Sequence, residues 1–211
     1  GNALLGLTYK YKWNNQINLY GQFVLDEFSL GDIKKSDNSW KNKYGYQLGI
    51  KYYNAFRVSD LLLQLEYNHV RPYVYSHSAP LTNYGHNNQS IGHQWGGNFK
   101  ELIAIARYHK GRYFADAKVT MGTRGLDFDA SENNFNYGGN IYKDYDENRP
   151  FDTDVKVGQG DKTAVFIADF QWGYLVNPAT NLKIFGSYMY RSFDPTKNTV
   201  STFSESTNWL T

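Results

Sequence analysis

The segment from residue 77 to residue 99 holds the side chains best suited to binding chemistry in this 211-residue chain. Its sequence, HSAPLTNYGHNNQSIGHQWGGNF, is rich in amides, imidazoles and aromatic rings. Amides form hydrogen bonds with sugar hydroxyls, and aromatic rings pack on the C–H faces of sugars. The residues expected to contact a polysaccharide are Tyr84, His86, Asn87, Asn88, Gln89, His93 and Trp95. The alternative is a segment that folds inward and stabilises the protein, and the two roles are compatible.

Metal binding has little support in the same segment, although imidazole is a common metal ligand. His77, His86 and His93 are separated by nine and seven positions, and neither spacing matches a compact zinc pattern. The chain has no Cys, which excludes Cys-based metal sites, thiol nucleophiles and disulfides. We therefore expect no metal and no cofactor.

A long acidic segment, residues 123–160, contains one run that resembles the start of a calcium-binding loop. Asp144, Asp146 and Asn148 match its first ligands, but Arg149 and Val155 stand where a Gly and a Glu are required. The chain also lacks a G-x-S-x-G motif, and its Ser, His and acidic residues show no spacing typical of a catalytic triad. We expect no catalytic residues and no enzyme activity.

The composition indicates which elements hold these segments. Aromatic residues make up 18% of the chain while the mean hydropathy is −0.64. Much of the apolar content is therefore Tyr, Phe and Trp, which favour strands and membrane–water boundaries. The net charge of +2 gives no basis for a nucleic-acid partner. No stretch approaches the ~18 consecutive apolar residues of a transmembrane helix.

Apolar and polar residues alternate with a period of two in eight segments, as in strands that have one apolar face, although in residues 99–109 both faces carry apolar residues. In one of them, Tyr46, Leu48 and Ile50 alternate with Gln47 and Gly49. The segments are residues 5–13, 16–26, 44–52, 61–68, 99–109, 112–121, 163–174 and 181–191, and a ninth begins near residue 209. Most are long enough to cross a bilayer at a tilt, which takes about 9–11 residues.

The connections between these segments alternate between short and long. Short ones lie at residues 14–15, 54–59, 110–111 and 177–180, and long polar ones at 29–42, 77–98, 123–160 and 192–208. Short turns at one end and long outer loops at the other are typical of an up-and-down outer-membrane barrel. We treat residues 1–211 as a single barrel region.

The distribution of charges and rings favours a membrane barrel over a soluble sandwich or lipocalin-like barrel, which would also alternate. The polar faces carry charges such as Lys51, Glu66 and Lys118, whereas the apolar faces end in rings such as Tyr52 and Trp172. The sequence predicts an all-β, antiparallel, up-and-down transmembrane β-barrel of the bacterial outer membrane. Because the chain begins and ends inside strand-like sequence, its eight or nine strands are expected to be about half of a larger barrel.

The region from residue 66 to residue 101 resembles a known family. Its sequence is EYNHVRPYVYSH at residues 66–77, NYGHNNQ at 83–89, GH at 92–93 and GGNFKE at 96–101. This pattern is similar to the Wzi-type capsule-assembly family, and more closely to its Bacteroidetes relatives linked to gliding motility, the RemB-like proteins. The resemblance implies a plugged or narrow outer-membrane barrel whose outer side engages surface polysaccharide.

We therefore expect a non-enzymatic outer-membrane barrel that binds or organises cell-surface polysaccharide, in capsule attachment or gliding motility. The expected partners are outer-membrane lipid and lipopolysaccharide, surface polysaccharide, and other outer-membrane motility or secretion proteins. No nucleic acid is expected to bind.

Two other functions stay open at this stage. The first is a porin or substrate-specific channel, in which inward lysines would form an anion-favouring lumen. Those lysines are Lys10, Lys12, Lys51, Lys118 and Lys183. The second is an accessory barrel subunit of a secretion or motility complex, with loop aromatics as protein contacts. Those aromatics are Phe135, Tyr137, Tyr142 and Tyr145.

Overall fold

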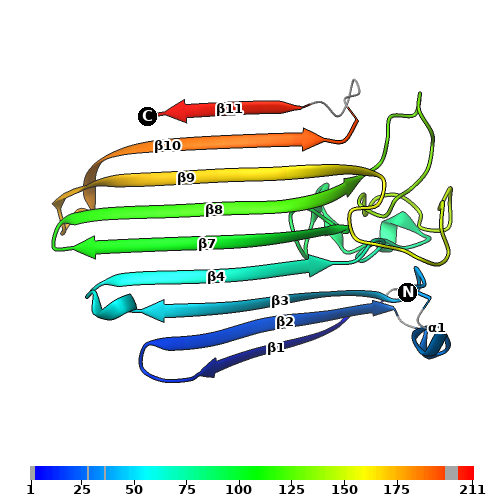
Figure 1. Cartoon of the computed structure of the whole chain (residues 1–211), viewed down its shortest axis with the longest axis horizontal. Helices are drawn as coiled ribbons and strands as arrows, with labels where there is room; N and C mark the ends of the chain where they lie inside the picture. The colour runs from blue at the N-terminus through cyan, green and yellow to red at the C-terminus, as the bar shows by residue number, and fades with distance from the viewer. Residues whose placement is uncertain (1–2, 28, 36, 198–203) are drawn as a thin grey trace.

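The computed structural model describes residues 3–27, 29–35, 37–197 and 204–211. Nine strands form one antiparallel sheet in chain order, and β5 and β6 form a separate hairpin (Figure 1). The strands are β1 (Leu5–Lys12), β2 (Ile17–Glu27), β3 (Lys43–Tyr53), β4 (Leu61–Val70), β5 (Gly85–His86), β6 (Gln89–Ser90), β7 (Phe99–Lys110), β8 (Tyr113–Leu126), β9 (Asp161–Asn177), β10 (Leu182–Pro195) and β11 (Glu205–Leu210). The helices are α1 (Leu30–Lys35) and the 3-10 turns η1 (Ala55–Arg57) and η2 (Pro80–Thr82). No helix among these residues is long and apolar enough to cross a membrane.

Short connections join β1–β2, β3–β4, β7–β8 and β9–β10 at one end of the sheet, which we call the turn end. Long connections join β2–β3, β4–β7, β8–β9 and β10–β11 at the other end, the loop end (Figure 1). Residue 36 of the predicted loop 29–42 and residues 198–203 of the predicted loop 192–208 lie outside the described residues. Three strands extend furthest beyond their predicted bounds: β8 continues to Leu126, β9 spans Asp161–Asn177, and β10 continues to Pro195.

The prediction of an all-β antiparallel fold is confirmed, but the described sheet does not close into a barrel. β1 pairs only with β2, and β11 pairs only with β10. Since each neighbouring pair is antiparallel and there are nine strands, β1 and β11 run in the same direction (Figure 1). These two edges therefore cannot close onto each other as an antiparallel pair.

The strand register gathers the alternating apolar residues onto one side of the sheet, the apolar face. Residues directly opposite each other in neighbouring strands lie on the same side, so the pairings identify its members. They include Leu19, Tyr46, Leu48, Ile50, Tyr52, Leu63, Leu65, Tyr67, Leu102, Ala104, Ala106, Val119, Met121, Phe166, Ala168, Phe170 and Trp172. No described helix forms a layer over this face, and Leu48, Leu65 and Phe170 are 49%, 45% and 43% exposed.

The opposite side, the polar face, carries amides and charges. Its members include Thr8, Gln22, Gln47, Asn68 and Glu101, which form one continuous row across five strands, and Lys10, Lys51, Glu66, Arg107, Lys118 and Asp169. Within this face the Tyr20 ring crosses directly over Gly49, where a Cβ would lie 2.1 Å from the ring. Its hydroxyl then donates to Glu66 on β4 (2.6 Å). Glycine at position 49 is therefore required by this close approach.

The hydrophobic core lies at the loop end. There, residues 71–98 and 127–160 pack together and against the polar face, and we call this packed unit the cap. Val74, Trp95 and Ile141 from the cap pack with Phe99 and Val165, whose side chains belong to the polar face. The polar face is therefore covered by the chain's own loops at this end.

Candidate functional site

The hairpin of β5 and β6 presents four of the seven residues predicted to bind polysaccharide. His86, Asn87, Asn88 and Gln89 are all exposed. Asn87 and Asn88 adopt left-handed backbone angles (φ 47° and 58°), as in the two-residue type I′ turn that favours Asn. The Asn-Asn pair therefore forms a tight turn, and the hairpin presents its polar side chains to solvent.

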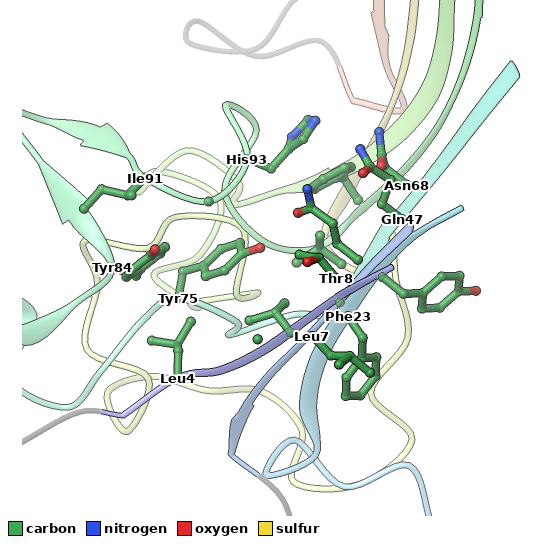
Figure 2. Close-up of a pocket in the computed structure, with 18 residues that line it drawn as sticks. Leu4, Leu7, Thr8, Phe23, Gln47, Asn68, Tyr75, Tyr84, Ile91 and His93 are labelled. Carbon is green, nitrogen blue, oxygen red and sulfur yellow. The ribbon is translucent and has the colours of Figure 1, made fainter. Parts of the chain in front are cut away.

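Tyr84 lies just before this hairpin and stacks on Tyr75 at a ring-centroid distance of 5.8 Å. Both rings line a cleft of about 360 Å³ between the cap and the first strands of the polar face. Figure 2 shows the two rings side by side, with Gln47 and Asn68 contributed by the strands. Tyr75 is buried, and Tyr84 is 37% exposed, so Tyr84 is the ring that a ligand could reach.

His93 is held by hydrogen bonds within the protein. Its Nδ1 accepts the backbone N–H of Trp95 (3.1 Å), so the ring proton lies on Nε2, which donates to Glu101 Oε1 (2.8 Å). The imidazole also stacks on Phe99 at 4.2 Å. Both nitrogens and one ring face are therefore used internally, which makes His93 a positioning residue of the cap.

Glu101 connects His93 to a polar network on the strands. Asn68 Nδ2 donates to Glu101 Oε1 (2.8 Å) and to Glu66 Oε1 (3.0 Å), and Glu66 accepts from Tyr20. Glu101 is 2% exposed, and its Oε2 has no partner within the described part of the chain. The network fixes the cap on the polar face at the middle of the sheet.

Trp95 is largely buried, in contrast to the stacking role expected from the sequence. It is 8% exposed and packs edge-to-face on Phe99 at 5.4 Å. The Gly96-Gly97 pair that follows allows this, because Gly96 has φ 71° and both glycines approach the backbone of the 127–160 segment. The indole therefore offers little surface to a ligand.

A second, wider cleft of about 740 Å³ opens between the hairpin and the 127–160 segment. It is lined by Asn88, Gln89, Ser90, Gln94, Trp95, Gly96, Arg124, Leu126, Asp127, Gly139, Asn140 and Tyr142. We call it the amide cleft. Within the described residues, the side-chain amides of Asn88, Gln89 and Gln94 make no hydrogen bond to the protein. They therefore remain free to pair with a ligand.

Asn98 holds the two walls of the amide cleft together. It is fully buried with φ 57°, and its Nδ2 donates to the carbonyls of Tyr137 (3.0 Å) and Gln159 (2.9 Å). Its Oδ1 accepts the Gly158 N–H (2.7 Å). Asn83 adds a bond from Nδ2 to the Ile141 carbonyl (3.2 Å). The cleft is therefore formed by segments fixed to each other.

The structure divides the seven predicted residues between separate environments. Tyr84 and His93 line the smaller cleft, Asn88, Gln89 and Trp95 line the amide cleft, and His86 and Asn87 line neither. The prediction did not include the other side of the amide cleft, which is contributed by Arg124, Asp127, Asn140 and Tyr142. These residues are 36 or more positions from the hairpin turn at 87–88, and no local pattern links them to it.

Two further sequence features have structural roles. Tyr137 and Tyr145, proposed as protein contacts, are buried in the cap, whereas Phe135 and Tyr142 are exposed. Asp146 of the calcium-like run pairs with Arg149 (3.4 Å). No group of three or more His, Cys, Asp or Glu side chains that could hold a metal occurs in the part of the chain that is described.

In comparisons with protein-family models, curated proteins and solved structures, this chain matches none.

Proposed function

We propose that this chain forms part of the wall of a bacterial outer-membrane β-barrel and binds surface polysaccharide in the amide cleft of its cap. The observation that carries the membrane part is the uncovered apolar face, which extends across β1 to β9. A soluble protein rarely leaves a continuous apolar surface of this size open. Lipid is the solvent that such a face fits.

The dimensions of the apolar face support this proposal. On β7 the charges facing that side are Lys100 and Lys110, and Leu102, Ala104 and Ala106 lie between them. Ten residue steps span about 34 Å along a strand, or about 26 Å along the membrane normal at a tilt of about 40°. That length matches the apolar band of about 25 Å in outer-membrane barrels.

Aromatic rings flank an aliphatic centre on the same face. The central row consists of Leu19, Ile50, Leu65, Ala104, Val119 and Ala168. Toward the turn end lie Tyr108, Tyr113, Trp172 and Tyr174, and toward the loop end lie Tyr44, Tyr46 and Tyr67. Rings at both boundaries and aliphatic residues between them are the arrangement expected of a lipid-facing surface.

The two edge strands, β1 and β11, determine how many strands the proposed barrel wall needs. A strand edge in lipid leaves backbone groups unpaired, and each such group costs several kcal/mol. In a membrane, β1 and β11 therefore each need a further strand as a neighbour. Because β1 and β11 run in the same direction, an antiparallel sheet can close between them only through an odd number of additional strands. The proposal thus requires a wall with more strands than the nine described here.

The chemistry of the amide cleft supports polysaccharide as the ligand. Its free amides offer paired donors and acceptors, as sugar hydroxyls require, and Tyr142 provides a partly exposed ring. The cleft lies among the long connections of the sheet, and in outer-membrane barrels the long loops are on the outer side, which supports this proposal. Attachment of capsule or a part in gliding motility is the cellular role that we propose, with no catalysis.

A cysteine experiment tests the membrane part, because the chain has no native Cys. Ala117 and Lys118 are adjacent on β8 and point to the apolar and the polar face respectively. In Ala117→Cys a bimane label should be quenched by brominated lipid in vesicles. In the matched Lys118→Cys variant the fluorescence of the label should be quenched by aqueous iodide and not by brominated lipid. Equal iodide quenching at both positions would contradict membrane insertion.

Binding is tested separately by measuring retention of the detergent-purified chain on immobilised surface polysaccharides. The variant Asn88→Ala/Gln89→Ala/Gln94→Ala removes the free cleft amides and should lose saturable binding. His86→Ala, outside both clefts, is the matched control and should bind like the parent chain. Parent-like binding by the triple variant would remove the amide cleft from the proposal.

A channel is the second candidate, because five lysines lie on the polar face. They are Lys10, Lys12, Lys51, Lys118 and Lys183. Against an open channel, the cap packs on this face at the loop end. Planar-bilayer recordings separate the two functions, since a channel conducts steadily and a capped barrel conducts little.

A further inference from the structure

We infer that Arg124 is the anion-binding residue of the amide cleft, so that the polysaccharide it takes is acidic and carries sugar carboxylates, as uronic acids do. This inference rests on the proposed polysaccharide binding and adds the chemical class of the ligand. It depends on the charges in the cleft, on the contacts of the guanidinium and on the chemistry of the neighbouring residues.

The charges lining the cleft do not balance. Arg124 and Asp127 are its only charged lining residues in the described part of the chain. Asp127 already accepts from Lys143 Nζ (2.6 Å) and from the Tyr137 N–H (2.7 Å). Arg124 forms no ion pair with any described residue. One positive charge is therefore left without a counter-ion at the cleft wall.

The contacts of Arg124 hold the guanidinium in place without using up its donors. It lies near the loop end of β8, opposite Phe99 and Thr163. One N–H of Nη2 donates to the Trp95 carbonyl (3.2 Å), and the guanidinium lies over the Trp95 ring at 5.6 Å. The Nε atom is buried and has no partner among the described residues. Of five N–H donors, four have no protein acceptor in that part of the chain.

A carboxylate is the group that this arrangement fits. A guanidinium presents parallel N–H donors that match the two oxygens of a carboxylate, and the contact with the Trp95 ring helps to hold it in place. The free neutral amides Asn88, Gln89 and Gln94 line the same cleft and would pair with the hydroxyls of the same sugar chain. Arg124 thus selects for acidic sugars, and the amides supply general affinity.

Three uronic-acid polymers, polygalacturonate, alginate and hyaluronate, provide the test. Each is compared with the same polymer after its carboxylates are reduced to primary alcohols, which keeps the sugar backbone. The detergent-purified full chain should bind the acidic form of at least one polymer about tenfold or more tightly than its reduced form. Added salt should weaken the binding of the acidic form more than that of the reduced form.

Arg124→Gln should abolish this preference and bind both forms alike. Arg124→Lys keeps the positive charge but loses the paired N–H donors of the guanidinium, so it should show an intermediate preference. This variant also reports whether the cap tolerates substitution at this position. Arg107→Gln is the matched control, because Arg107 lies on the same polar face toward the turn end with a 58% exposed side chain. It should retain the full preference.

The outcomes separate this inference from the proposed function. Equal binding of acidic and reduced polymers by the parent chain would overturn the anion-binding role and leave polysaccharide binding intact. A preference that survives in a folded Arg124→Gln variant would overturn the role of this residue. Absence of binding to all six polymers would overturn polysaccharide binding and this inference together.

Discussion

At the scale of single residues, the cap depends on side chains whose hydrogen bonds are nearly all internal. His93 uses both ring nitrogens, and Asn98 bonds to three carbonyls and one N–H of neighbouring segments. A buried polar group that is satisfied in this way fixes one arrangement, since any other would leave it unpaired. These residues are rigid supports for the clefts.

Glu101 provides the first prediction at this scale. Glu101→Ala removes the acceptor of the His93 Nε2–H and one of the two acceptors of the Asn68 amide, and unpaired buried groups cost about 1–3 kcal/mol each. We expect the free energy of unfolding to fall by about 2–4 kcal/mol on this basis. Glu101→Gln keeps an acceptor oxygen and should lose clearly less. Denaturant unfolding in detergent measures both, and equal losses would show that the hydrogen bonds contribute little.

Tyr75 provides a prediction about pH. Burial, followed by the nearby Tyr84 and Asp26, raises the pKa of the Tyr75 phenol from 10.0 to about 12. Because the folded-state pKa is the higher one, this stabilising contribution is complete below pH 10 and is lost as the pH rises from about 10 through 12. An alkaline titration followed by phenolate absorbance should show a late-titrating group that is absent in Tyr75→Phe. A parent curve identical to that of Tyr75→Phe would contradict the burial of this ring.

At the scale of elements, the sequence predicts strands far better than it predicts the cap. Period-two alternation depends only on neighbouring residues, so it locates strands such as β3 and β9 from their own side chains. The burial of Trp95 and Tyr137 depends on two loops packing together, which leaves no periodic trace in either loop. The alternation does not predict the extension of β8 to Leu126, because Thr123 and Gly125 occupy the apolar-face positions that follow Met121.

The central aliphatic row gives a prediction about the sheet itself. Ala168 lies in that row on β9, and Gln171 lies on the polar face of the same strand, opposite Asp116. If the apolar face contacts lipid, Ala168→Arg should reduce stability in vesicles by about 2–4 kcal/mol. Gln171→Arg gains an opposite charge and should change stability by no more than about 0.5 kcal/mol. Unfolding titrations in phospholipid vesicles measure both, and similar small effects would indicate that Ala168 faces water.

At the scale of the whole molecule, the two ends of the sheet differ in what they can do. The turn end has only short connections, whereas the loop end carries the core, both clefts and the hairpin (Figure 1). In a membrane this asymmetry gives the molecule an orientation, because long loops of outer-membrane barrels lie outside and short turns lie in the periplasm. Binding of surface polysaccharide requires that orientation.

Two epitope insertions test this orientation in cells that export the chain to the outer membrane. One follows Leu81, which is fully exposed at the loop end, and the other follows Gly111, in the open β7–β8 turn. Antibody should label intact cells only when the epitope follows Leu81, and permeabilised cells in both cases, because the membrane separates the two ends. Since insertions at exposed tips leave the fold intact, both proteins should accumulate equally. Labelling of intact cells at Gly111 alone would reverse the orientation and place the amide cleft in the periplasm, where surface polysaccharide is not anchored. Labelling at both sites would mean that the sheet does not span the membrane.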